Sequence, residues 1–66
     1  MLLHEEREYA VDVLEGNTER RALRLRGLDH AEAMACAERM QRDGKIVRVM
    51  HMVGATGHEV DRYPPR

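Results

Sequence analysis

The chain has 66 residues, with 11 lysines and arginines against 12 aspartates and glutamates, and its net charge at pH 7 is −1 with neutral histidines. This length predicts one small domain, residues 1–66, without room for a catalytic domain beside a binding domain. Hydrophobic residues make up 42% of the chain, which is too many for intrinsic disorder, and no apolar run approaches the roughly 20 residues of a membrane-spanning helix. The single cysteine, Cys36, excludes an intramolecular disulfide, and the acidic start is unlike a signal peptide. We therefore expect a protein of a reducing cytoplasm.

The first third of the chain predicts a β-hairpin. Apolar and polar residues alternate from residue 7 to residue 14 and again from about residue 19 to residue 26, which is the period-two pattern of half-buried strands. The apolar positions that would share one face are Tyr9, Val11, Val13, Leu23 and Leu25.

The loop of this hairpin must keep those positions on one face. A two-residue loop at residues 16–17 would mix the two faces, because it pairs odd positions with even ones. A loop of three or five residues preserves the face. It also places Glu8 or Asp12 opposite Arg26 or Arg24 on the other side of the sheet.

A helix is expected from residue 31 to residue 42. Asp29 is suited to cap its first turn, and Glu32, three residues later, completes a capping box. No helix-breaking residue follows until Gly44, which is placed to adopt the left-handed conformation at the C-terminal end. The inner face is rich in alanine, so the helix axis can lie close to a sheet.

The last third predicts two further strands. Residues 45–53 are apolar on both sides, which is typical of a central strand, residues 54–57 form a turn, and residues 58–63 form a short final strand. The order is β-β-α-β-β. We therefore expect an α+β fold in which one helix packs on one face of a four-stranded, mostly antiparallel sheet.

The sequence does not favour an enzyme, a cofactor or a metal site. Cys36 lies in the middle of the expected helix, where nothing nearby would activate its thiol, so we interpret it as a small buried apolar residue. The histidines have no paired metal-ligand spacing, and no second cysteine accompanies Cys36. They are His4, His30, His51 and His58.

The sheet face away from the helix is the candidate interaction surface. If the helix covers the odd-numbered side, the even-numbered side is left uncovered, with an apolar centre and a charged rim, which is how protein-binding surfaces are composed. The candidate partner-binding residues are Glu8, Asp12, Arg20, Arg24, Arg26, Arg48, Met50 and Met52. Because exposed charges contribute little to folding, we expect charge reversal at Arg24 or Arg48 to spare stability.

Three other interpretations of this face stay open. The first is a nucleic-acid-binding regulator that uses Arg20, Arg24, Arg26 and Arg48, although the net charge is near zero and no aromatic residue stands there to stack a base. The second is a homodimer that buries the face. The third is a solvated surface in which arginines pair with Glu8 and Asp12.

The arrangement of the chain resembles a known family. An extended pair of strands is followed by residues 27–33, a short alanine-rich helix, residues 44–49 and a last hairpin. This layout, over about residues 9–63, resembles the small β-β-α-β-β anti-CRISPR proteins directed against type I CRISPR systems. The resemblance implies a non-enzymatic inhibitor in the bacterial cytoplasm, from a phage or another mobile genetic element. Such an inhibitor would bind an effector complex and block target-DNA recognition or nuclease recruitment.

Overall fold

A computed structural model describes residues 7–64, which form four β-strands and one α-helix. The elements in chain order are β1 (Tyr9–Leu14), β2 (Arg21–Leu28), α1 (His30–Arg42), β3 (Val47–Val53) and β4 (Thr56–Tyr63). The predicted β-β-α-β-β order and α+β class are confirmed.

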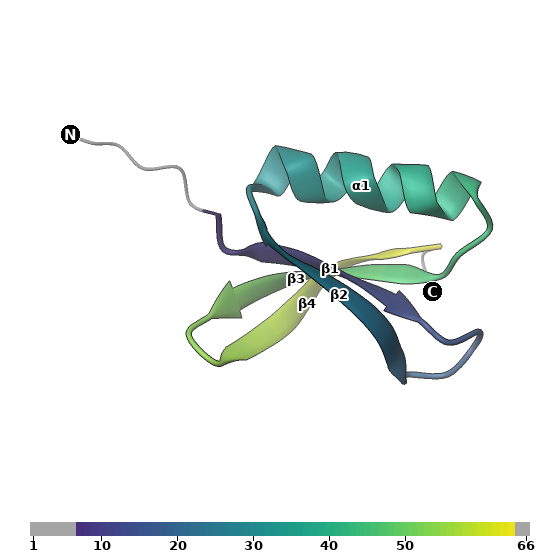
Figure 1. Cartoon of the computed structure of the whole chain (residues 1–66), viewed down its shortest axis with the longest axis horizontal. Helices are drawn as coiled ribbons and strands as arrows, with labels where there is room; N and C mark the ends of the chain where they lie inside the picture. Colours follow the sequence, from purple (N-terminus) through teal and green to yellow (C-terminus); the bar gives the residue numbers. More distant parts are fainter. Residues whose placement is uncertain (1–6, 65–66) are drawn as a thin grey trace.

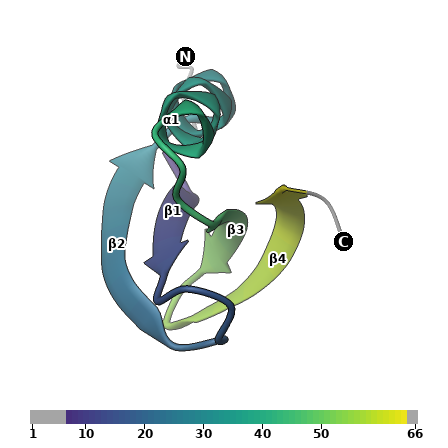
Figure 2. The same ribbon diagram turned by 90° about the vertical axis from the view of Figure 1, so that its right-hand side faces the viewer.

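The four strands form one antiparallel sheet in the order β2-β1-β3-β4. The first and last hairpins are thus joined through their inner strands, and β2 and β4 are the edges. The helix lies along one side of this sheet, and the tips of both hairpins bend away from it (Figure 1). Figure 2 shows the same curvature from the end of the helix.

The register between β1 and β2 keeps the apolar positions on one face, as expected. Val11 lies opposite Leu25, and Val13 lies opposite Leu23. On the other face Asp12 pairs with Arg24, which was one of the predicted charge pairs.

The loop of the first hairpin has neither of the expected lengths. The N–H of Glu15 donates to the carbonyl of Arg20 at 2.9 Å, which leaves a four-residue loop at residues 16–19. Such a loop alone would mix the faces. A β-bulge restores them, because β2 carries one extra residue, Ala22, between the partners of Val13 and Leu14.

Two further bulges interrupt the edge strands. β2 has an extra residue at Arg26 and Gly27, where Gly27 takes a φ of +74°, and β4 has an extra residue at Val60. Bulges increase the local twist and break the row of edge hydrogen-bonding groups. They account for the strong curvature of this small sheet.

The helix begins and ends as its sequence predicts. Asp29 accepts a hydrogen bond from the N–H of Glu32 at 2.8 Å, and the Glu32 side chain accepts one from the N–H of Asp29 at 3.0 Å. At the other end Gly44 has a φ of +87°, and the N–H of Lys45 donates to the carbonyl of Met40 at 3.1 Å. The helix has 13 residues, and within residues 7–64 no helix is long and apolar enough to cross a membrane.

The main core lies between α1 and the two central strands. Its buried residues are Val11, Val47, Val49, Ala33, Cys36 and Ala37. The small helix residues let α1 approach β1 and β3 closely. The edge strand β2 contributes only the partly buried Leu25 and Leu28. The odd-numbered side of β1 and β3, and of β2 as far as its bulge at Arg26 and Gly27, therefore faces the helix, as the alternation predicted; beyond that bulge the even-numbered Leu28 faces it.

Candidate protein-binding surfaces

Asp12 is the centre of the sheet face opposite α1. Its side chain is 0% exposed, although the charge of a carboxylate normally requires water or close partners. Arg24 on β2 donates to both carboxylate oxygens, at 2.6 and 2.8 Å, and the Nε of Arg48 on β3 donates to Oδ2 at 3.1 Å. The antiparallel register places these arginines on either side of Asp12.

These contacts set the protonation of Asp12. Burial by itself would raise the pKa of its carboxyl, but the hydrogen bonds and charges of Arg24 and Arg48 outweigh burial and hold the pKa below its ordinary value. The same hydrogen bond raises the pKa of the Arg24 guanidinium. Asp12 and Arg24 are therefore both ionised at neutral pH.

The ion pairs continue to the opposite edge of the sheet. Glu19, from the loop between β1 and β2, accepts from Arg48 at 3.3 Å and from Arg62 on β4 at 3.1 Å. Glu59 accepts two further hydrogen bonds from Arg62, at 2.7 and 3.0 Å. We call the set the sheet-face network; its members are Asp12, Glu19, Arg24, Arg48, Glu59 and Arg62. Three acids and three bases balance, so this arginine-rich row carries no net charge.

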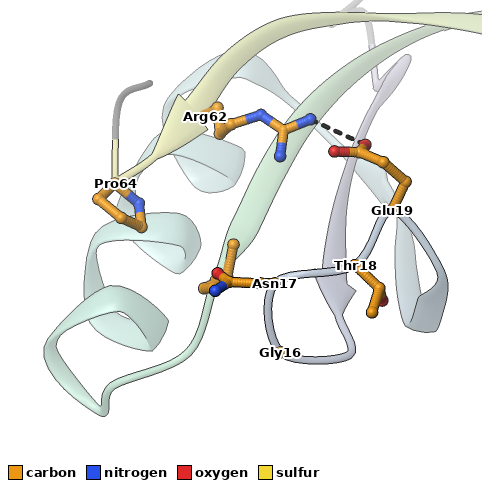
Figure 3. A pocket seen from close by; sticks show the side chains of 7 residues that line it. Gly16, Asn17, Thr18, Glu19, Arg62 and Pro64 are labelled. Carbon is orange, nitrogen blue, oxygen red and sulfur yellow. Dashed lines mark hydrogen bonds and ion pairs between the residues drawn. The ribbon is translucent and has the colours of Figure 1, made fainter.

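A shallow cavity of about 310 Å³ lies at the end of this network. The loop of the first hairpin forms one wall, and Arg62 and Pro64 form another (Figure 3). The guanidinium of Arg62 points across it to Glu19. Because Glu19 and Glu59 hold this cation, the cavity does not offer a free positive charge to an anionic ligand.

The predicted uncovered apolar centre of this face is wrong. Met50 and Met52 are only 7% and 8% exposed and form a second buried cluster with Ala10. The bend of the sheet closes over them. Gly57, the partner of Met52 on β4, leaves room for its side chain, because a Cβ at this position would lie 2.5 Å from the sulfur of Met52. Partner binding by these methionines stays a prediction, but their side chains offer little surface for it.

The other three candidate residues lie apart from this group. Arg20 closes the hairpin loop and its Nε lies 3.8 Å from Oε1 of Glu15, and Glu8 lies directly before β1, where its Oε1 is 3.1 Å from Nε2 of His51. Arg26 is exposed near the far end of β2 and makes no ion pair in the described part of the chain. The structure thus separates the eight predicted residues into a charged group of buried Asp12 with partly buried Arg24 and Arg48, a buried methionine pair and three exposed charges.

The histidines lie near one another without forming a metal site. The ring of Tyr9 contacts His30 at 5.1 Å and His51 at 4.9 Å between centroids, and His51 contacts His58 at 5.5 Å. Across residues 7–64, no three histidine, cysteine or acidic side chains are placed to hold a metal ion. The remaining histidine, His4, lies outside the described residues. Cys36 is buried in the core, which agrees with its interpretation as an apolar residue.

A groove between α1 and β2 is a surface that the sequence did not indicate. Its volume is about 570 Å³. Leu25 and Leu28 of β2 and Ala35 and Cys36 of α1 supply apolar walls. The remaining lining residues are charged and are Arg24, Arg26, Glu32 and Arg39. The groove exists because α1 packs over β1 and β3, so the helix side of β2 is only partly covered.

Comparison with protein-family models, with curated proteins and with solved structures found no match to this chain.

Proposed function

We propose that this chain acts by binding another protein and not by catalysis, and that its partner is a subunit of a type I CRISPR effector complex. The observation that supports protein binding is the groove between α1 and β2, where apolar walls lie between the exposed arginines Arg26 and Arg39. Apolar contact area flanked by arginine is characteristic of protein interfaces. The CRISPR target is what the β-β-α-β-β resemblance implies, with inhibition by occupation of a surface in the bacterial cytoplasm.

The charges of the sheet favour a protein partner over a nucleic acid. Arg24 and Arg48 are held by Asp12, and Arg48 and Arg62 are held by Glu19. Phosphate binding gains affinity from cations that are free to replace counterions. Arginines already paired with carboxylates supply little of this gain, so the nucleic-acid interpretation loses two of its four residues, Arg24 and Arg48.

A plaque assay tests this function. The gene is expressed in bacteria whose type I CRISPR system targets a phage, and a copy with an early stop codon serves as the control. We expect the intact chain to restore plaque formation and to co-purify with the effector complex. Unchanged immunity across the type I subtypes would remove the CRISPR target from the proposal.

A further inference from the structure

We propose that the groove between α1 and β2 binds an acidic amphipathic helix of the partner protein. The apolar side of that helix would lie on Leu25, Leu28 and Ala35, and its carboxylates would pair with Arg26 and Arg39. This inference rests on the proposed function only in assuming that the chain binds a protein, and it does not depend on which protein is bound.

The walls of the groove provide apolar area that the fold itself does not cover. Leu25 and Leu28 are partly buried because the helix covers the central strands first. Further along the same side of β2, Leu23 is 49% exposed. On the helix side, Ala35 and Cys36 are small and leave room for side chains of a partner to enter. A row of partly exposed leucines beside small residues suits the spaced apolar residues of one helix face.

The charge of the groove selects an acidic partner. Arg26 and Arg39 are exposed, and neither guanidinium makes an ion pair or hydrogen bond with any other residue of the described chain. The acid of the groove, Glu32, is already engaged, since it accepts from Arg7 at 2.7 Å and caps the N–H of Asp29. Among residues 7–64 the uncompensated charge of the groove is therefore positive, and a partner with carboxylates complements it.

The edge of β2 favours a helix over an added strand. An extended peptide would need a continuous row of backbone groups, but the bulges at Ala22 and Gly27 interrupt that row. Side-chain contacts along the groove have no such requirement. The 13 residues of α1 are about 20 Å long, so a partner helix of about four turns can lie beside it.

A synthetic peptide provides the direct test. The probe is a fluorescein-labelled helix of about four turns with leucine at positions i, i+3, i+4 and i+7 and glutamate on both flanks. Two comparison peptides replace every glutamate with lysine or place a proline at the centre. Fluorescence anisotropy with the full chain should give binding of the glutamate peptide at least about tenfold tighter than either comparison peptide.

Variants of the protein locate the site. The double variant Arg26→Glu with Arg39→Glu should weaken the glutamate peptide at least about tenfold, and Ala35→Glu should do the same because it fills the groove with a like charge. Each variant has a matched control at exposed positions outside the groove. The double variant Arg20→Glu with Arg42→Glu is the control for the arginine pair, and Ala31→Glu is the control for Ala35→Glu. They should bind the peptide like the wild type, and circular dichroism verifies that every variant is folded.

Several results would overturn the inference. One is that the glutamate peptide shows no binding up to about 1 mM, or that the lysine or proline peptide binds equally well. Another is that the double variant binds the glutamate peptide as tightly as the wild type does. A third is that a duplex DNA displaces the peptide because it binds the same groove more tightly. A chain that fails the peptide test but still restores plaques keeps its proposed function and uses another surface. If the chain binds the peptide but restores no plaques, the groove binds an acidic helix and the partner is a protein other than a CRISPR effector subunit.

Discussion

Asp12 is the residue on which the face opposite α1 depends. A fully buried carboxylate is costly unless charges and hydrogen bonds replace the lost water, and Arg24 and Arg48 supply both. The two arginines are themselves only 20% and 19% exposed. They therefore stabilise the fold, in contrast to the expectation that they form an exposed rim.

Charge reversal at two positions of β2 distinguishes an arginine that stabilises the fold from an exposed one. Arg24→Glu would place a second carboxylate beside buried Asp12, and we expect it to lower the free energy of unfolding by about 3–5 kcal/mol. Arg26→Glu, two residues away and exposed, should change it by no more than about 0.5 kcal/mol. Urea unfolding measures both.

Arg24→Lys provides an intermediate for this comparison. It keeps the positive charge but loses the two-bond geometry of the guanidinium, so its stability should fall between wild type and Arg24→Glu. It also keeps the test informative if Arg24→Glu does not fold. Equal losses for Arg24→Lys and Arg26→Glu would show that the Asp12 contacts are unimportant.

Asp12 also predicts how stability depends on pH. Although burial opposes it, the two arginines hold the pKa of Asp12 below its ordinary value of about 4. A group whose folded-state pKa is depressed contributes stability that is fully present above its unfolded-state pKa and is lost as pH falls through the folded-state value. We therefore expect the stability difference between wild type and Asp12→Asn to be largest near neutral pH and to shrink below about pH 4.

Urea unfolding from about pH 7 to about pH 2.5 measures this difference. Asp43→Asn, at the exposed C-terminal end of α1, is the matched control. A difference between wild type and Asp12→Asn that stays constant over this range would contradict the role assigned to the Asp12 charge.

At the scale of elements, the strands and the ends of α1 could be predicted from the sequence, because local interactions determine them. Alternation identified the strands, and the pair of Asp29 and Glu32 placed the start of α1 within one residue of His30. Gly44 likewise marked its end. These features depend on backbone hydrogen bonds and conformations of a few neighbouring residues, which the sequence displays directly.

The bulges could not be predicted in the same way. The second strand was expected at residues 19–26 and lies at Arg21–Leu28, because the loop closes at Arg20 and extra residues at Ala22 and Gly27 restore the register. Whether a strand carries one more residue than its partner depends on pairing across the sheet. The alternation of apolar and polar residues along one strand therefore does not reveal a bulge.

The same limit applies to the candidate surfaces. The even numbers of Asp12, Arg48 and Met50 predicted that they lie on the face away from the helix, and that prediction is correct. Their burial depends on the curvature that the bulges impose, so the sequence overstated how accessible they are. The groove beside β2 depends on where α1 lies across the sheet, which the apolar pattern of the helix does not specify.

At the scale of the whole molecule, stability depends on a core of small side chains. The sequence has no phenylalanine or tryptophan, and the largest fully buried apolar residues are Val11, Val47 and Val49. A domain of 66 residues has a total stability of about 3–10 kcal/mol. Each buried valine therefore carries a large share of it.

Two valines of β3 make this dependence testable. Val49 is 0% exposed, so Val49→Ala removes two buried methyl groups and leaves a cavity that its close-packed neighbours cannot fill, which should cost about 2–3 kcal/mol. Val53 is 57% exposed, and the same substitution there should cost less than about 0.5 kcal/mol. Thermal unfolding followed by circular dichroism should show a Tm lower by roughly 10–20 °C for Val49→Ala and nearly unchanged for Val53→Ala. Similar melting temperatures for the two variants would mean that the packing between α1 and the central strands does not hold this fold together.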